Sequence, residues 1–251
     1  MILVLDAGNS RLKWAESRPD GWFPGSSFPL TGDAPPVEWQ ALARPERVVG
    51  GSVAGASAGE RIAAWTRAQW GREPEWLGST AEAFGVRNAY REPARLGIDR
   101  WAALLSAHRA ELAPVCIVDC GSAITVDVLA RDGRHLGGWI APGRGMMGQC
   151  LLTGTADIRF ETVASGSPGA LFGRDTAEAV EGGTRAALAG LVERALREAD
   201  TLCEDSVACL LTGGDAEWLA PGISRQCRIV PDLVLRGLAQ LAGVHSSGID
   251  L

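Results

Sequence analysis

The chain has 251 residues, of which 46% are hydrophobic and 22% are charged, with a formal net charge of −6. This length fits one large domain or two modest ones, and the hydrophobic fraction allows a sizeable core. The negative charge argues against a general nucleic-acid surface, and the lack of any apolar run of about 18 residues argues against a membrane-spanning helix.

The first half of the chain predicts strands alternating with helices. Short apolar runs predict strands at 2–6, 10–16, 47–52 and 74–77. Ser57 and Glu60 match a capping box, which predicts that a helix begins there. Residues 80–98 are polar and predict a loop, after which helical spacing of apolar residues predicts a helix over 98–112.

The second half repeats this scheme. Strands are predicted at 115–119, 123–130, 135–141, 207–211 and 229–230, and helices at 144–152, 175–199, 215–220 and 232–242. Asp175 followed by Glu178 supplies the start of the longest helix. Because both halves mix strands and helices, we predict an α/β protein with two similar lobes, residues 1–113 and 114–251.

The six cysteines and the N-terminus predict a cytoplasmic location. No C-x-x-C pair occurs, and Cys116 and Cys120 fall in a predicted strand and turn. Such cysteines are typical of reduced, buried thiols rather than of a disulfide or zinc set. The chain begins directly with an apolar strand and has no charged leader, so no signal peptide is expected.

One short pattern occurs twice: an apolar strand, Asp, any residue, Gly and a polar residue. The copies reach their Asp at Asp6 and at Asp119, 113 residues apart (119 − 6). A carboxylate, bare backbone amides and a hydroxyl at one turn suit Mg²⁺ and phosphate. We therefore expect two related half-domains that hold one nucleotide between them. The alternative is that both copies are core hairpins of a duplicated fold without activity.

Two further groups of residues add chemistry to these turns. Lys13 would lie on the strand that returns beside Asp6, placing an ammonium for phosphate near a carboxylate for hydrated Mg²⁺. Asp99 and Arg100 begin a predicted helix, where a carboxylate can accept a hydroxyl proton and a guanidinium can hold a substrate carboxylate. A plain hairpin with an Asx turn, and a simple helix cap, are the structural alternatives.

Four motifs follow one another along the chain: Asp6-Ala-Gly-Asn-Ser-x-x-Lys13, Gly97-Ile-Asp-Arg100, Asp119-Cys-Gly-Ser-Ala-Ile-Thr125 and Gly137-Gly-Trp-Ile-Ala-Pro-Gly143. Together they resemble type III pantothenate kinases, members of the sugar kinase, Hsp70 and actin superfamily. The resemblance implies two ribonuclease-H-like lobes with mixed sheets flanked by helices. It also implies ATP-dependent phosphorylation of pantothenate to 4′-phosphopantothenate, the first step of coenzyme A biosynthesis.

The resemblance implies roles for individual residues. Asp99 would accept the proton of the substrate hydroxyl. Pantothenate would be bound by Tyr90, Gly97, Ile98, Asp99, Arg100 and Thr176. The nucleotide and its phosphates would be bound by Asp6, Ala7, Gly8, Asn9, Ser10, Arg11, Leu12, Lys13 and Ser122. Asp6 would hold Mg²⁺ through water, and Asp119 would bind a monovalent cation, K⁺ or NH₄⁺. Family members are dimers with the substrate site near the subunit interface, so a homodimer is expected.

Other interpretations stay open at this point. The chain could be a non-catalytic nucleotide-binding regulator of the same fold, or a kinase for another small hydroxyl substrate such as a sugar. Leu211–Ala216 resembles the superfamily's adenosine-side turn, although a plain two-glycine turn explains it equally well. The stretch Gly143–Gly148 matches G-x-G-x-x-G without a βαβ unit, and Gly55–Gly59 matches G-x-S-x-G without a suitable histidine.

Overall fold

The computed structural model describes residues 1–30, 32, 34–160 and 172–244, and the chain divides into two compact units. The first comprises Met1–Leu112, Asp132–His135 and the residues from Asp232 onward; the second comprises Ala113–Arg131 and Leu136–Pro231. The sequence predicts a second lobe of residues 114–251, which would include the residues from Asp232 onward. They join the first unit instead because their helix packs there. Within the described residues, no helix is long and apolar enough to cross a membrane.

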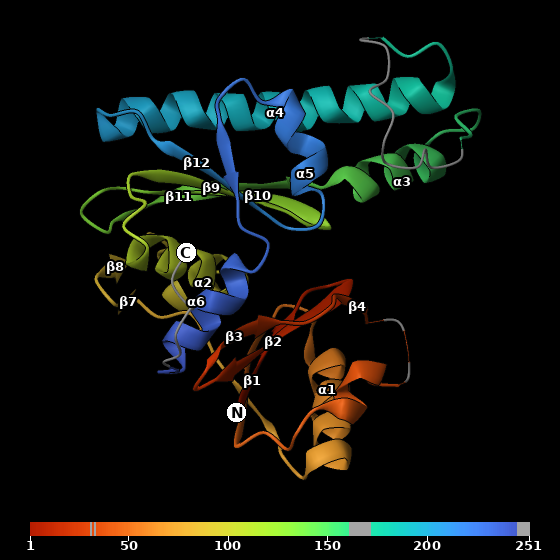
Figure 1. Ribbon diagram of the computed structural model, residues 1–251. Coiled ribbons are helices and arrows are strands. Elements are labelled where there is room, and N and C mark those ends of the chain that lie inside the picture. Colours follow the sequence, from red (N-terminus) through yellow and green to blue (C-terminus); the bar gives the residue numbers. More distant parts are fainter. Residues whose placement is uncertain (31, 33, 161–171, 245–251) are drawn as a thin grey trace. The chain divides into compact units, whose positions relative to one another are not determined.

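The first unit is built on a mixed sheet with strand order β3-β2-β1-β5-β6 (Figure 1). Its strands are β1 Ile2–Ala7, β2 Arg11–Arg18, β3 Gly21–Pro24, β5 Arg47–Ser52 and β6 Pro74–Trp76, with β4 Phe28–Pro29 pairing with β2. β1 runs antiparallel to β2 and parallel to β5. A separate small hairpin, β7 Glu82–Ala83 and β8 Val86–Arg87, lies in the segment that was predicted to be loop.

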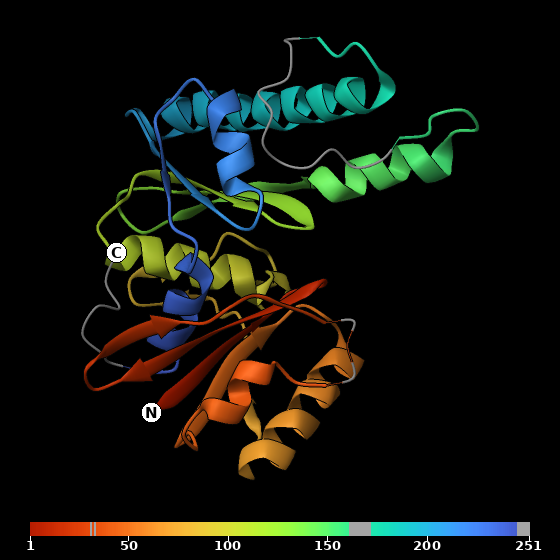
Figure 2. The same cartoon turned by 45° about the vertical axis from the view of Figure 1, so that its right-hand side comes forward.

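Helices cover both faces of this sheet (Figure 2). α1, Ala56–Trp70, packs on the face that carries Leu3 and Leu5. α2, Ile98–Arg109, and α6, Leu233–Leu241, pack against each other and cover the other face. The two helices approach closely at Gly237, where a Cβ would collide with the backbone of Ala102. Two short 3₁₀ helices, Val37–Ala41 and Pro93–Arg95, complete the unit.

The second unit repeats the topology of the first, with strand order β11-β10-β9-β12-β13. Its strands are β9 Val115–Cys120, β10 Ala123–Leu129, β11 His135–Pro142, β12 Ala208–Thr212 and β13 Cys227–Ile229. Its helices are α3 Arg144–Gly154, α4 Thr176–Cys203 and α5 Ala216–Leu219, followed by a 3₁₀ turn at Ala220–Gly222. In each sheet the first strand of the repeated pattern has an antiparallel and a parallel neighbour. The duplication predicted from the sequence is therefore a duplication of topology.

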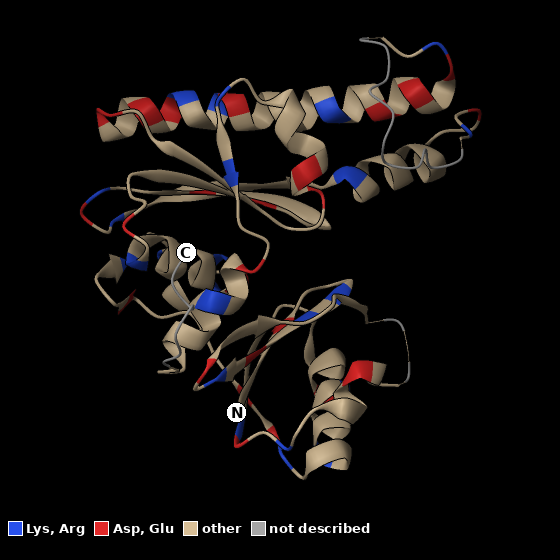
Figure 3. Cartoon of the chain, viewed as in Figure 1, with Lys and Arg blue, Asp and Glu red and all other residues tan. Residues whose placement is uncertain are grey.

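The long helix α4 covers one face of the second sheet (Figure 1). Leu188, Val192 and Leu196 pack in one core cluster with Cys116 and Val118 of β9. Acidic and basic residues occur along the length of α4 (Figure 3). Its sequence is thus amphipathic, with an apolar stripe on the sheet.

Most predicted elements are confirmed. The differences are strand β3 and the β7–β8 hairpin, which were not predicted, and the ends of several other elements. The helix predicted from Asp175 begins as expected, because the Asp175 carboxylate accepts a hydrogen bond of 2.8 Å from the Glu178 amide. The capping box predicted at Ser57 is wrong. Helix α1 begins one residue earlier, after Gly55, whose φ of 82° turns the chain into the helix without a side-chain cap.

Candidate active site

The first repeated turn joins β1 to β2 and is closed by its backbone. The Gly8 amide donates to the Arg11 carbonyl at 3.0 Å. Asp6 lies next to the end of β1, is buried at 8% exposure and is aligned with Lys13 on β2. Residues aligned across antiparallel strands have side chains on the same face. The carboxylate and the ammonium therefore lie on one face of the sheet, as the hairpin predicted.

The residues of this turn divide into exposed and buried groups. Asn9, Ser10 and Arg11 are exposed. The side chains of Ala7 and Leu12 are fully buried in the core that packs on α1, which leaves only their backbone for a ligand. The Arg11 guanidinium donates to the hydroxyl and the carbonyl of Ser27, at 2.5 and 2.6 Å. Arg11 therefore ties the turn to the loop before β4.

The start of α2 lies against the strand that is paired with Asp6. Gly51 of β5 is aligned with Asp6, and a Cβ on Gly51 would lie 2.9 Å from the side chain of Ile98. Only glycine permits this approach, which sets the first residue of α2 directly on the sheet. Asp99, the second residue of the helix, is half-buried, and its carboxylate accepts a hydrogen bond of 2.8 Å from the Arg100 amide. This geometry brings Asp6 and Asp99 to the same region of the first unit.

Arg100 connects the helix start to Tyr90. The Arg100 side chain is buried at 5% exposure, and its Nη1 donates to the Tyr90 hydroxyl at 2.7 Å. Tyr90 is held in turn by its neighbours. Its amide donates to the Asn88 side chain at 3.0 Å, and its ring stacks on His135 at 6.4 Å. The structure thus joins two residues that the resemblance assigned to pantothenate, and it shows Asn88 and His135 as their supports.

Three turns of the second unit meet around Asp119. In the repeated turn, the Gly121 amide donates to the Ala123 carbonyl at 3.2 Å. Gly143, after β11, donates its amide to the Ser122 carbonyl at 3.0 Å, and a Cβ on Gly143 would collide with that carbonyl. Gly213, after β12, has φ 89°, and a Cβ there would collide with the Asp119 carboxylate. Bare backbone from two other turns therefore encloses the Asp119–Ser122 segment.

A charged network joins the turn at Gly143 to the turn at Gly213. The Arg144 guanidinium donates to Glu181 at 2.7 Å and lies 3.7 Å from Asp215. Burial raises the pKa of Asp215, and the positive charge of Arg144 opposes that rise. Trp218 packs between Arg144 and Arg185, with guanidinium carbons 4.5 and 4.9 Å from its ring centre. The network holds α3, α4 and α5 together behind the Asp119 turn.

Thr176 lies in a different part of the second unit. It begins α4 and lines a pocket of about 1020 Å³ between α3 and α4. The lining is largely apolar and includes Met146, Met147, Cys150 and Leu151 of α3, with Ala179 and Val180 of α4. Asp119 points to the other face of the sheet, because Val118 and Cys120 face α4 and side chains alternate along a strand. α3 connects the two places, since it begins beside Ser122 and continues along the pocket.

Some supporting residues had no clear signal in the sequence. Gly51 could have been found from the sequence, because two glycines inside a predicted strand indicate a close backbone approach. Asn88 had no such signal, because it lies in a segment without periodicity. It acts through its amide group, which donates to the carbonyls of Thr80 and Pro93 and shapes the loop before Tyr90.

The family of this chain follows from a comparison with known protein families. A family model described as type III pantothenate kinase matches residues 2–198, which include both repeated turns and the start of α2. The chain belongs to the type III pantothenate kinase family. A type III pantothenate kinase of Nitrosococcus oceani is 36% identical over 96% of this chain and 94% of its own length. One of Aromatoleum aromaticum is 40% identical over 96% and 98%.

Solved structures share the fold of this type III pantothenate kinase chain. A Campylobacter jejuni protein assigned to the Baf family of transcriptional activators has a TM-score of 0.61 at 20% identity, over 96% of this chain and 97% of the other. A Sinorhizobium meliloti protein assigned as a 2-dehydro-3-deoxygalactonokinase has a TM-score of 0.54 at 18% identity, over 96% and 98%. These identities support the fold alone. They agree with the predicted α/β architecture of two mixed sheets flanked by helices.

Proposed function

We propose that this chain transfers the γ-phosphate of ATP to the primary hydroxyl of pantothenate, giving 4′-phosphopantothenate and ADP. Membership of the family supports this reaction. The observation that carries it is the contact of Ile98 with Gly51, which sets the Asp99–Arg100 start of α2 beside the Asp6 strand end. In this proposal, the Asp99 carboxylate that accepts the hydroxyl proton and the Asp6 turn that binds phosphate belong to the same unit.

Asp99 is the proposed catalytic residue. Its carboxylate accepts the hydrogen bond of the pantothenate hydroxyl, orients the oxygen toward the γ-phosphorus, and takes the proton as the new P–O bond forms. Phosphoryl transfer passes through a loose transition state, so orientation is the larger part of this role. Arg100, with Tyr90, binds the pantothenate carboxylate, for which a guanidinium fork is well suited.

The two repeated turns supply the nucleotide contacts in this proposal. The amides of Gly8, Asn9 and Ser10, with the Lys13 ammonium and the Ser122 hydroxyl, bind phosphate oxygens. Asp6 would hold the Mg²⁺ of Mg-ATP through a water molecule. No cluster of three or more metal-ligating side chains occurs in the described parts of the chain. When bound, Mg²⁺ neutralises the charge on the transferring phosphate.

Asp119 is the proposed site of a monovalent cation. Its carboxylate lies beside Gly213, which is also approached by the Cys120 carbonyl. Such oxygen-rich surroundings fit a hard cation.

Replacement of Asp99 tests the reaction. We expect Asp99→Asn to lower kcat by about a hundredfold or more, the usual scale for loss of a general base. The measurement is coupled ADP release with pantothenate, Mg²⁺ and K⁺, with hexoses as competing substrates. Glu73→Gln is the matched control, because Glu73 follows the end of α1 and forms an exposed ion pair with Arg67. Near-normal turnover in the Asp99 variant would show that Asp99 takes no part in the reaction. Faster ADP release with a hexose than with pantothenate would show that the substrate is a hexose.

The cation is tested separately. We expect full activity in K⁺ or NH₄⁺ and a rate at least about tenfold lower in buffer containing only Na⁺, because the enclosure selects by ion size and dehydration. Asp119→Asn should abolish the difference between the salts. Equal rates in all three salts would contradict the assignment of Asp119.

We also propose that the chain forms a homodimer through β11 and α3. β11 is the edge strand of its sheet. It carries Trp139 and Ile140 at 40% and 63% exposure, and α3 carries Met146 at 51%. Large apolar side chains gathered on a sheet edge and the adjoining helix are typical of an interface. This surface adjoins the pocket that Thr176 lines, which suits a substrate site close to the partner.

A further inference from the structure

Three cysteines occupy one row across the second sheet. Cys209 on β12 is aligned with Cys116 on β9 and with Cys227 on β13. Aligned residues of neighbouring strands, about 4.8 Å apart, have side chains on the same face. All three belong to the cluster that packs under α4. The row ends at Cys227, because β13 is the outer strand of the sheet.

Cys209 and Cys227 have the geometry of a pair. Their sulfurs lie 2.9 Å apart, although none of the six cysteines is in a disulfide. The spacing of neighbouring strands falls in the window of about 4.4–6.8 Å that Cα atoms take in disulfides. A bond between these sulfurs therefore needs side-chain rotation and no displacement of a strand.

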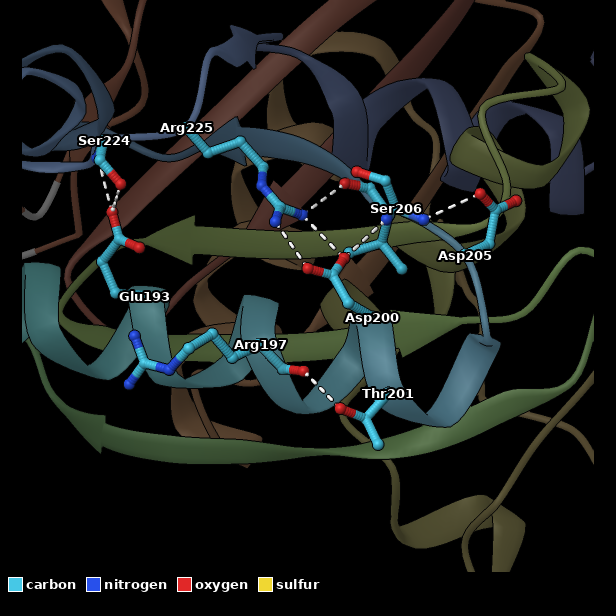
Figure 4. Close-up of polar contacts among 9 residues, drawn as sticks. Glu193, Arg197, Asp200, Thr201, Asp205, Ser206, Ser224 and Arg225 are labelled. Atoms are coloured by element: carbon cyan, nitrogen blue, oxygen red, sulfur yellow. Dashed lines mark hydrogen bonds and ion pairs between the residues drawn. The ribbon is translucent and has the colours of Figure 1, made fainter.

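The segment before β13 is firmly held (Figure 4). The Arg225 guanidinium donates to both carboxylate oxygens of Asp200, at 2.9 and 2.6 Å, and to the Val207 carbonyl at 3.0 Å. The Cys227 sulfur lies 3.3 Å from the Arg225 carbonyl. These contacts anchor the start of β13 to the end of α4, so Cys227 stays opposite Cys209.

The two thiols differ in reactivity. Cys227 is partly exposed, whereas Cys209 is buried. Hydrogen bonding with Cys209 lowers the pKa of the Cys227 thiol, burial opposes this, and the charge of Arg225 supports it. The same hydrogen bond and burial raise the pKa of Cys209, and burial raises that of Cys116 to about 12. Because Cys227 is the more exposed of the two, an oxidant from solvent should react first at Cys227.

We propose that Cys227 and Cys209 form a reversible oxidation site that takes a small peroxide as its oxidant. The Cys227 thiolate attacks one peroxide oxygen; an S–O bond forms, the O–O bond breaks, and the other oxygen leaves as hydroxide, which is protonated to water. The Cys209 sulfur then attacks the Cys227 sulfur. The S–S bond forms, and the departing hydroxide takes the Cys209 proton as a second water. Two thiols and one peroxide give one disulfide and two waters, and a dithiol reverses the change by exchange.

The bond would fasten the outer strand to the strand that leads into the Asp119 turn. β13 pairs with β12 through three aligned positions only, and β12 ends at Thr212, which is aligned with Asp119. A cross-link that restricts the unfolded chain stabilises the folded one. We expect the oxidised protein to unfold at a Tm roughly 5 °C higher.

The experiment treats the full chain with hydrogen peroxide, blocks the remaining thiols with a maleimide under denaturing conditions, and counts labels by intact mass. The count should fall from six to four per chain, and dithiothreitol should restore six. Peptide mapping should find a Cys209–Cys227 link. Cys150→Ser is the matched control, because it removes an exposed thiol and leaves the pair, so its count should also fall by two. Cys209→Ser and Cys227→Ser should form no internal disulfide.

Three results would overturn the proposal: an unchanged count of six, a link that joins other cysteines, or conversion of Cys227 to sulfinic acid without a disulfide. The peptide map of the unsubstituted chain decides among them even if a serine variant fails to fold.

Discussion

At the scale of single residues, Arg100 shows how a buried charge defines a site. A guanidinium at 5% exposure needs acceptors around it, because an uncompensated buried charge is costly. The Tyr90 hydroxyl supplies one of them at 2.7 Å, and the ring lies under the guanidinium carbon at 5.6 Å. If this pair binds pantothenate as proposed, its rigidity before binding reduces the entropy lost on binding.

Removal of the Tyr90 hydroxyl should therefore act on substrate binding. We expect Tyr90→Phe to raise the KM for pantothenate about tenfold, since a hydrogen bond to a charged group contributes about 1.5–3 kcal/mol, while kcat changes little. Steady-state kinetics against pantothenate and against ATP provide the measurement, with the KM for ATP as the internal control. A fall in kcat at constant KM for pantothenate would place Tyr90 in the chemical step instead.

The aspartates of the two turns could be predicted from the sequence because each follows an apolar strand and precedes a glycine. Their surroundings could not. The contacts of Gly51 with Ile98 and of Gly213 with Asp119 join positions far apart in the chain, and no local pattern specifies which element fills the space above a glycine. The support of Tyr90 by Asn88 and His135 is missed for the same reason.

At the scale of elements, the ends of α4 illustrate two ways of fixing a helix. Its N-terminus follows the local rule, with Asp175 as cap. Its C-terminal turn is fixed by tertiary contacts, since Asp200 binds Arg225 in the loop before β13 (Figure 4). The sequence predicts an end near Ala199, whereas the helix continues to Cys203 because this pairing and the sheet below hold its last turn. The type of each element can thus be predicted from the local sequence, whereas its ends depend on tertiary contacts.

The Asp200–Arg225 pair should contribute stability that depends on pH. The hydrogen bonds from Arg225 lower the pKa of Asp200 below its ordinary value of 3.8. A lowered folded-state pKa means that the contribution is present above the unfolded value and is lost as pH falls through the folded value. We expect Asp200→Asn to cost about 1 kcal/mol at pH 7 and progressively less below about pH 3.5.

Thermal unfolding at several pH values measures this effect. Glu198→Gln is the matched control, because Glu198 lies on the same helix and pairs with Arg194 at 2.7 Å on an exposed surface. Its effect should be a few tenths of a kcal/mol. A destabilisation by Asp200→Asn that stays constant down to pH 2 would contradict the linkage.

At the scale of the whole molecule, the repeated strand order β3-β2-β1-β5-β6 and β11-β10-β9-β12-β13 explains why the two turns are alike. Each sheet places its first strand between an antiparallel and a parallel neighbour, so the Asp-x-Gly turn follows a central, buried strand in both units. The units differ in what covers them. The first is covered by α1 on one face and α2 with α6 on the other, whereas α4 covers a face of the second.

The proposed dimer is a property of the whole molecule and can be tested by mass. Light scattering should give twice the mass of one chain. Ile140→Glu should reduce it to one, because a carboxylate on this surface cannot be buried against a second copy. Val37→Glu is the matched control, since Val37 is similarly exposed at 69% but lies in the first unit. A single-chain mass for the unsubstituted protein would refute the dimer.

The return of the chain to its first unit at Asp232 has a consequence for biosynthesis. β1, β5 and α2 leave the ribosome long before α6, and until α6 arrives the backbone of Ala102 lacks its cover at Gly237. The first unit therefore stays incomplete while the entire second unit is translated, and its uncovered apolar surface is accessible to chaperones during that time. A premature stop before α6 would leave the β1–β2 hairpin on an unfinished scaffold, so only nearly complete translation products should acquire activity.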